Sequence, residues 1–382
     1  MFFDKLRGSI KIVIIIAVIT FAISTLWSQG ISFVSRNPAD YYLVARVGKK
    51  RIEQDQFQQV FATEMERQRN YFGTVSPDRV EGIKAYALDR LIDYYLMLDA
   101  VEKEKIQAPQ EDIDKAMGEF KGQFEDDAQY KEWLEYIGYT EKMISDVFAE
   151  DIKLEKLIEK MAGNVTVTDT EIEEAFESIK QQGDTLEDMR DYIGTRLMEI
   201  KRAEQFEKWL LSYRDKVKIT IVDPQIAAYN HLVAGEYDKA IDKYEEALKK
   251  YGDDPYIYTS IGQAYMDLGL KDKGISTYQK ALTLNEADPS LHLFLGNAYM
   301  QAEKETEALK SYKNASELAT GNSYSDLMIH YTLADIYNSK ELTDEAAYEN
   351  EIISGILAAM ALQDDTQTAT TGTSSNNTTT AN

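Results

Sequence analysis

A group of small and aromatic residues recurs along this chain at an interval of 34 residues. Gly262 and Gly296 are 34 residues apart (296 − 262), and each follows a large aliphatic residue and precedes a tyrosine by three positions. The residues that recur downstream are Gly274, Tyr278 and Ala281, which become Ala308, Tyr312 and Ala315. Self-similarity at this period is typical of stacked helix-turn-helix units. Because one such unit cannot bury its apolar face alone, we expect an array that forms a binding groove rather than a catalytic centre.

The recurring positions resemble the tetratricopeptide repeat, and about four units can be traced over residues 223–362. The first unit carries Gly235, Tyr237, Ala240, Tyr244 and Ala247, and the fourth carries His330, Leu333, Ala334, Tyr337 and Ala346. The resemblance implies an α-solenoid in which small residues let the two helices of a unit approach and aromatic rings fill the space between units. Asp254-Pro255 and Asp288-Pro289 are predicted to begin helices.

The resemblance also predicts which residues line the concave face and bind a protein partner. They are the first-helix positions that packing does not use: Tyr256, Thr259, Gln263, Met266, Leu293, Asn297, Met300, Met328 and Tyr331, with Ser290, Asp335 and Asn338 at equivalent positions. None is Lys or Arg, so a cationic clamp for a C-terminal carboxylate is not expected. Methionine and tyrosine favour an adaptable surface. The alternative is that the chain's own helices cover part of this face, for instance residues 352–362.

Charge and composition exclude several classes of function. The net charge is −24, from 66 acidic against 42 basic residues, which argues against nucleic acid because phosphate binding needs clustered cations. The chain has no cysteine, which excludes disulfides and thiolate metal sites. Its three histidines, His231, His292 and His330, lie at first-helix positions of the repeats, where packing is the expected role. No cofactor or metal site is predicted.

An apolar stretch near the N-terminus predicts a membrane anchor. Residues 10–27 are nearly all apolar and would span ~27 Å at ~1.5 Å per residue, close to the hydrocarbon thickness of a bilayer. Lys5, Arg7 and Lys11 favour a cytoplasmic N-terminus. A cleaved signal peptide is the alternative, although no clean cleavage site follows the stretch. We therefore expect a single-pass protein of the inner membrane, with the bulk of the chain in the periplasm.

The region between the anchor and the repeats is predicted to be mainly helical. Helices are expected over residues 54–72, 80–105 and 186–216, and Ile52 and Phe57 are expected to open the first. Between them, one helix is expected to begin near Pro109 and a later one to end near Met161. Thr168 and Glu171 form a capping box before a further helix. Short strands are expected at 42–47 and 218–222, and these two strands could pair.

An ordered series of residues in this region resembles the opening module of the SurA/PpiD/PrsA-type extracytoplasmic chaperones. The series comprises Val44–Val47, Ile52, Phe57, Leu88–Asp93, Leu96, Pro109–Ile113, Ala116, Phe124, Tyr130, Leu134, Gly138, Thr140, Leu157-Ile158 and Val167–Asp169. The basic leader and anchor are most like PpiD. In many relatives a parvulin-type prolyl isomerase domain follows the capping-box helix, but here residues 177–184 are too few to form one. The resemblance thus implies a non-catalytic chaperone module.

Together these features predict an all-α protein with one small two-stranded pairing. The expected domains are a leader and transmembrane anchor (1–30), a SurA-N/PpiD-like chaperone domain (40–222), tetratricopeptide repeats (223–362) and a disordered tail (363–382). The favoured function is a membrane-anchored, non-catalytic chaperone or assembly factor that binds unfolded or newly exported polypeptides. One alternative is a scaffold for a cell-envelope complex. A prolyl isomerase-type foldase is disfavoured.

Overall fold

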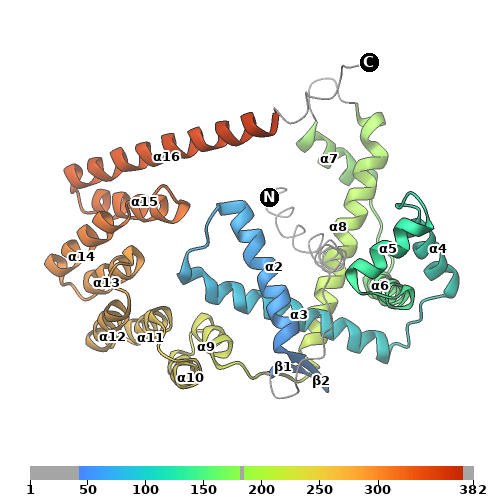
Figure 1. The fold of residues 1–382 in the computed structure, drawn as a ribbon, viewed down its shortest axis with the longest axis horizontal. Coiled ribbons are helices and arrows are strands. Elements are labelled where there is room, and N and C mark those ends of the chain that lie inside the picture. The colour runs from blue at the N-terminus through green and yellow to red at the C-terminus, as the bar shows by residue number, and fades with distance from the viewer. Residues whose placement is uncertain (1–42, 181–184, 373–382) are drawn as a thin grey trace. The chain divides into compact units, whose positions relative to one another are not determined.

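The computed structural model describes residues 43–180 and 185–372, with side chains to residue 361, and divides them into two compact units (Figure 1). The first unit holds the described residues of Met1–Asp55 and Asp89–Thr220; the second holds those of Gln56–Leu88 and Ile221–Asn382. Within the described ranges no helix is long and apolar enough to cross a bilayer. The predicted anchor at residues 10–27 lies outside these ranges, so the structure does not test it.

A three-stranded sheet opens the first unit, in the order β2-β1-β3. β1 (Leu43–Val47) and β2 (Lys50–Glu53) form an antiparallel hairpin, and β3 (Ile219–Ile221) lies on the other side of β1. The predicted neighbour relation between the first and last strands is confirmed. The expectation that Ile52 opens a helix is wrong, because Ile52 lies in β2, opposite Ala45, with a fully buried side chain. The two-stranded pairing is therefore a three-stranded sheet.

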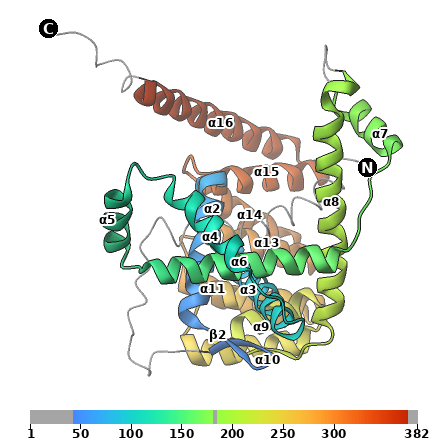
Figure 2. The same cartoon turned by 90° about the vertical axis from the view of Figure 1, so that its right-hand side faces the viewer.

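The helices of the first unit begin with the second part of α3 (Val80–Lys103). They continue with α4 (Gln110–Lys121), α5 (Asp127–Ile137), α6 (Glu141–Ala162), α7 (Asp169–Ile179) and α8 (Leu186–Arg214). Pro109 is the N-cap of α4 rather than a residue of its first turn. The predicted capping box of Thr168 and Glu171 starts α7. Figure 2 shows α6 crossing α8, against which it packs.

The aromatic residues of α4 and α5 form a buried cluster. Phe120 and Tyr130 are each 3% exposed, and the ring of Phe120 lies 5.5 Å from that of Trp133. Ile113, Met117, Leu134 and Ile144 complete this core. Most of the aromatic pattern seen in the sequence therefore serves packing, with Tyr136 as an exposed exception.

A polar clamp joins α8 to α3 in the first unit. Arg214 forms ion pairs with Asp89 and Asp93, the latter at 3.0 Å. Burial, together with the nearby Asp89 carboxylate, raises the pKa of Asp93 to about 6 despite the Arg214 charge. Tyr213, next to Arg214, donates a hydrogen bond of 2.7 Å to Asp99. Three consecutive turns of α3 are thus fixed to the end of one helix.

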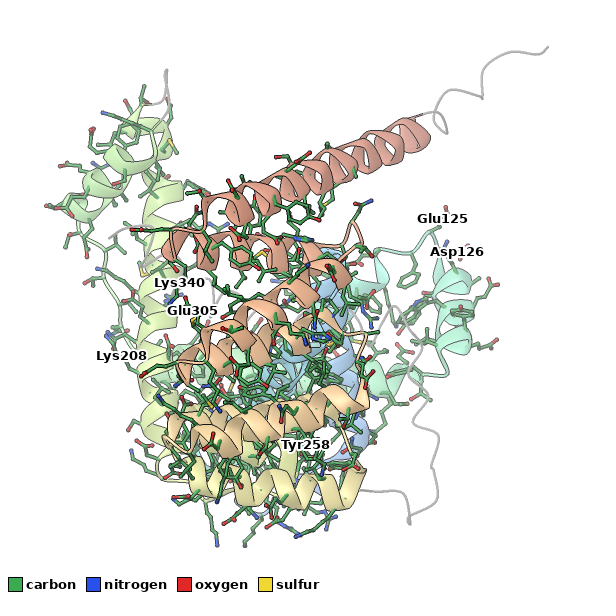
Figure 3. The ribbon with its side chains drawn as sticks, turned by 90° about the vertical axis from the view of Figure 1, so that its left-hand side faces the viewer. Glu125, Asp126, Lys208, Tyr258, Glu305 and Lys340 are labelled. Carbon is green, nitrogen blue, oxygen red and sulfur yellow. The ribbon has the colours of Figure 1, made fainter. Side chains whose placement is uncertain are left out.

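The second unit contains four antiparallel helix pairs that form a tetratricopeptide-like solenoid (Figures 1 and 3). The pairs are α9 (Pro224–Val233) with α10 (Tyr237–Tyr251), α11 (Pro255–Asp267) with α12 (Lys271–Leu284), α13 (Pro289–Gln301) with α14 (Glu305–Leu318), and α15 (Tyr324–Ser339) with α16 (Thr343–Gly372). Asp223, Asp254 and Asp288 each cap a helix whose first residue is proline. The predicted solenoid of about four units is confirmed.

Small residues set the spacing inside each pair. A Cβ atom added to Gly296 would lie 2.5 Å from the ring of Tyr312, and one added to Gly262 would lie 3.0 Å from the ring of Tyr278. A Cβ on Gly274 would overlap the sulfur of Met266. The 34-residue recurrence therefore records a steric requirement, in which a tyrosine ring of one helix rests on a glycine of its partner.

The same unit includes a helical hairpin from earlier in the chain. It is formed by most of α2 (Gln54–Phe72), the short 3-10 helix η2 (Pro77–Arg79) and the start of α3, and we call residues Gln56–Leu88 the α2–α3 hairpin. The sequence placed this segment in the chaperone domain. Its membership of the second unit follows from the contacts described below, whereas the domain boundaries themselves stay a prediction.

A buried ion pair locks the last helix pair. His330 and Glu349 are almost fully buried, and the Nδ1 atom of His330 lies 2.5 Å from the Glu349 carboxylate. The Nε2 atom lies 2.8 Å from the carbonyl oxygen of Ala319. Both ring nitrogens face acceptors, so both must donate, and the imidazole is held in its charged form. His330 thus packs in the core, as expected from the sequence.

α16 extends further than the sequence suggested. Ile353 and Ile356 pack against Leu327 and Ala334 of α15. The helix then continues to Gly372, although a disordered tail was predicted from residue 363. Helix propagation adds a hydrogen bond for each residue that is ordered, so packed turns can support further turns of weak propensity.

We expect Gly296→Ala to lower the free energy of unfolding by about 1–3 kcal/mol, because the new methyl group overlaps the Tyr312 ring. Gly355→Ala in α16 is the matched control, since nothing lies within 4 Å of its added Cβ. There the change should stabilise the helix by about 0.4–1 kcal/mol. Urea unfolding followed by circular dichroism measures both, and equal effects would contradict the steric role of Gly296.

The His330–Glu349 pair should make the stability of the last repeat depend on pH. Burial alone would lower the pKa of His330, but hydrogen bonds to Glu349 and Ala319 outweigh it and raise the pKa above 6.5. The pair's contribution is therefore complete below pH 6.5 and is lost as pH rises through the folded-state pKa. Melting temperatures between pH 6 and 9 should fall for the wild type and change less for Glu349→Gln. Parallel curves would refute this account.

Candidate protein-binding site in the repeat array

Four of the residues predicted to line the concave face are buried in the array instead. Thr259, Met266, Ser290 and Leu293 have 9%, 2%, 7% and 8% of their surface exposed. Met266 lies against Gly274, and Leu293 packs with Ala308 of the next helix. Their side chains are not displayed to a partner in this conformation, because the close approach of the helices consumes them.

Three other predicted residues form hydrogen bonds that hold the array together. The hydroxyl of Tyr278 donates to Gln263 at 3.1 Å, and the hydroxyl of Tyr312 donates to Asn297 at 2.9 Å. Each pair joins the second helix of a unit to its first helix at the same place in two successive repeats. Tyr256 donates to Asp288, the cap of the next repeat. The amides of Gln263 and Asn297 are nevertheless exposed.

The fourth repeat presents the predicted lining residues openly. Met328 and Tyr331 on α15 are each 43% exposed, and Asp335 and Asn338 are exposed as well. Their spacing of three, four and three residues places them on one side of the helix. Met300 on α13 is half-buried against the core of repeats three and four. We call Met328, Tyr331, Asp335 and Asn338 the α15 stripe.

In the first two repeats, a buried carboxylate from the α2–α3 hairpin meets the array. Glu81 is 6% exposed. Its Oε1 atom accepts from Gln225 Nε2 at 2.9 Å, and its Oε2 atom lies 3.0 Å from the Tyr244 hydroxyl and 2.8 Å from that of Ser260. These donors come from α9, α10 and α11. We call Gln225, Tyr244 and Ser260 the carboxylate cage.

Burial dominates the electrostatics of this cage. It raises the pKa of Glu81, while the hydrogen bonds from Gln225, Ser260 and Tyr244 oppose the rise. Burial of its own ring, and then the nearby Glu81 carboxylate, also raise the pKa of Tyr244, so its hydroxyl stays protonated and can donate. Lys84, from the hairpin itself, supplies a nearby positive charge that also opposes the rise. The cage is thus built from neutral donors.

The cage residues were not selected from the sequence. Tyr244 was recognised only as a packing tyrosine, Ser260 adjoins the predicted Thr259, and Gln225 lies before the recurring positions recognised in the first repeat. One available signal was Gln225 itself, a polar residue in the first turn of a repeat helix. The sequence also suggested residues 352–362 as the chain's own cover. Ile352, Ile353, Ile356 and Met360 from this stretch pack with α15, whereas the α2–α3 hairpin contacts the first repeats.

Comparison with known families agrees with this architecture. Residues 2–158 match the model of the SurA-like N-terminal domain. Residues 234–269 match a TPR repeat model, and residues 255–288 match a tetratricopeptide repeat model. The chain therefore joins a SurA-like N-terminal domain to tetratricopeptide repeats, as the two resemblances implied. No curated protein matches it.

Several solved structures of repeat proteins resemble part of the chain. MamA shares 23% identity over 34% of this chain and 73% of its own, with a TM-score of 0.27. The first TPR domain of human RPAP3 shares 25% sequence identity, and the match covers 35% of this chain and 88% of that domain, with a TM-score of 0.24. The Yersinia enterocolitica type III secretion translocator chaperone SycD shares 16% sequence identity, and the match covers 35% of this chain and 89% of SycD, with a TM-score of 0.24.

The two family matches define the class of protein. A chaperone-like SurA-N domain followed by tetratricopeptide repeats makes this a protein-binding chaperone or scaffold. Domains of both kinds are typically non-catalytic.

Removing one donor from the carboxylate cage should destabilise the second unit. Tyr244→Phe takes a hydrogen bond from a buried carboxylate, and we expect a loss of about 1–3 kcal/mol. Tyr278→Phe is the matched control, because its partner Gln263 is exposed and can bind water instead. Urea unfolding compares the two variants, and an equal or larger loss for Tyr278→Phe would contradict the role given to Glu81.

Proposed function

We propose that this protein is a membrane-anchored, non-catalytic chaperone or assembly factor that works outside the cytoplasm. In this proposal the SurA-like module holds unfolded or newly exported polypeptides, and the repeat array binds a protein partner. The anchor at residues 10–27 would keep the protein at the membrane surface, where tethering raises its effective concentration near emerging chains.

The observation that carries the partner-binding part is the α15 stripe. Met328 is an exposed apolar side chain, and Tyr331 is an exposed amphipathic one. The polar residues Asp335 and Asn338 lie further along the same side of the helix. Methionine adapts its shape to different partners, and tyrosine supplies contact area with little loss of side-chain entropy. Groups of this kind suit a peptide or helix with an apolar centre and a polar flank.

The chaperone activity can be tested with the full-length chain in detergent micelles. We expect a stoichiometric amount to suppress the light scattering of denatured citrate synthase on dilution, with empty micelles as the control. No suppression, combined with capture of one partner at fixed stoichiometry, would instead support a scaffold for a cell-envelope complex. A prolyl isomerase assay on the same preparation should show no activity.

Partner binding should depend on the α15 stripe. Met328→Asp with Tyr331→Asp places charges on the proposed contact surface, and we expect binding of a crosslinked native partner to weaken by at least about tenfold. The matched control is Tyr348→Asp with Leu357→Asp, because both residues are exposed on α16, outside the stripe. If both double variants bind equally well, partner binding does not use α15.

A further inference from the structure

The side chain of Gln225 contacts two residues of the α2–α3 hairpin at once. Its Nε2 atom donates to Glu81 at 2.9 Å, and its Oε1 atom accepts from Lys84 Nζ at 2.7 Å. Glu81 and Lys84 are three residues apart on α3, so they lie on one side of the helix. The side-chain amide of Gln225 therefore binds a glutamate and a lysine that are three residues apart on one helix.

The space at the residue that follows Glu81 suits a small side chain. A Cβ atom added to Gly82 would lie 3.0 Å from the hydroxyl of Tyr229 on α9. Glycine in a helix interior is less favourable than alanine, so helix formation does not explain its presence. The close approach of Tyr229 does. The part of α3 that meets the array is thus Glu81-Gly82-Ile83-Lys84.

The contact between hairpin and array is polar and partly open. A cavity of about 390 Å³ lies beside it, lined by Glu64, Gln68, Asp78, Arg79, Tyr86 and Tyr229 among others. Further along the hairpin, Phe72 contacts Tyr324 with ring centres 5.2 Å apart. By contrast, the core of the first repeats is an apolar cluster that includes Ala228, Ile241 and Ile257. A polar contact beside an open cavity buries less apolar surface than a closed core does, so opening it costs less free energy.

A buried carboxylate is also a costly way to gain stability. Taking a charge out of water is unfavourable, and apolar residues of similar volume often stabilise a protein as well or better. The donors of the cage recover that cost only for a ligand that places a carboxylate between them. The cage therefore gives specificity for a ligand with a carboxylate rather than a large gain in binding free energy.

We propose that Gln225, Tyr229, Tyr244 and Ser260 form a recognition site for a helix that carries glutamate, a small residue and lysine in the pattern Glu-small-x-Lys. In this structure the chain's own residues 81–84 fill the site. A protein partner with the same helical pattern reaches it by replacing them. This inference rests on the proposed protein-binding role of the array and names the ligand class of its first two repeats.

Amide hydrogen exchange on the full-length chain tests whether the hairpin is a ligand of the array. Glu81→Lys puts a cation among the cage donors and should speed exchange in α9 and the first half of α11 by at least about tenfold, leaving α13 unchanged. Glu66→Lys is the matched control, with the same charge change at an exposed site of the hairpin. Gly82→Leu is a second variant, in which the new side chain favours the helix but collides with Tyr229. It keeps the test decisive if the Glu81→Lys protein fails to fold.

A peptide competition tests recognition. Acetylated peptide 76–92 is added to the Gly82→Leu protein at about 1 mM, the order of effective concentration that a short tether supplies. We expect it to restore most of the lost protection in α9 and α11, and the same peptide with Glu81→Lys to restore none.

Two results would overturn the proposal. If Glu81→Lys and Gly82→Leu exchange like the Glu66→Lys control, the hairpin is not held by the cage. If both peptides protect equally or neither protects, the site does not recognise the carboxylate. Citrate synthase plays no part in these measurements, so a failed chaperone assay and a failed recognition site are distinguished.

Discussion

A carboxylate can stay buried in a protein only where donors replace the water that it loses. Glu81 meets this condition with three donors from three helices of the repeat array. The α2–α3 hairpin is therefore bound to the repeats, although the SurA-like family match includes it. The contact of the hairpin with the first two repeats depends largely on this one group.

The array presents two different surfaces, one occupied by the α2–α3 hairpin and one exposed. The first two repeats meet a segment of their own chain through neutral donors and Tyr229. The fourth repeat leaves Met328 and Tyr331 exposed. Between these parts, the glycine–tyrosine contacts at Gly262 and Gly296 keep the helices of each pair close. A rigid spacing of this kind allows separate sites on one array to keep their geometry, because packed repeats transmit contacts only to their neighbours.

Much of the helical architecture could be predicted from the sequence, for local reasons. Asp254-Pro255, Asp288-Pro289 and the Thr168–Glu171 box mark helix starts through contacts within a few residues. Ile52 was misplaced because a strand of four residues depends on pairing with a distant segment, which local pattern does not encode. Several predicted lining residues are buried by packing. Helical spacing predicts on which side of a helix a residue lies, but it does not predict which neighbouring helix packs against that side.

The sequence by itself determined that this chain contains stacked helical repeats after a SurA-like module, since the period of 34 residues records where glycine must face tyrosine. Only the tertiary structure decided which repeat face is filled and which is open. Glu81 and Gln225 are 144 residues apart in the chain. Their contact depends on the packing of the whole second unit, and no pattern within either segment specifies its partner.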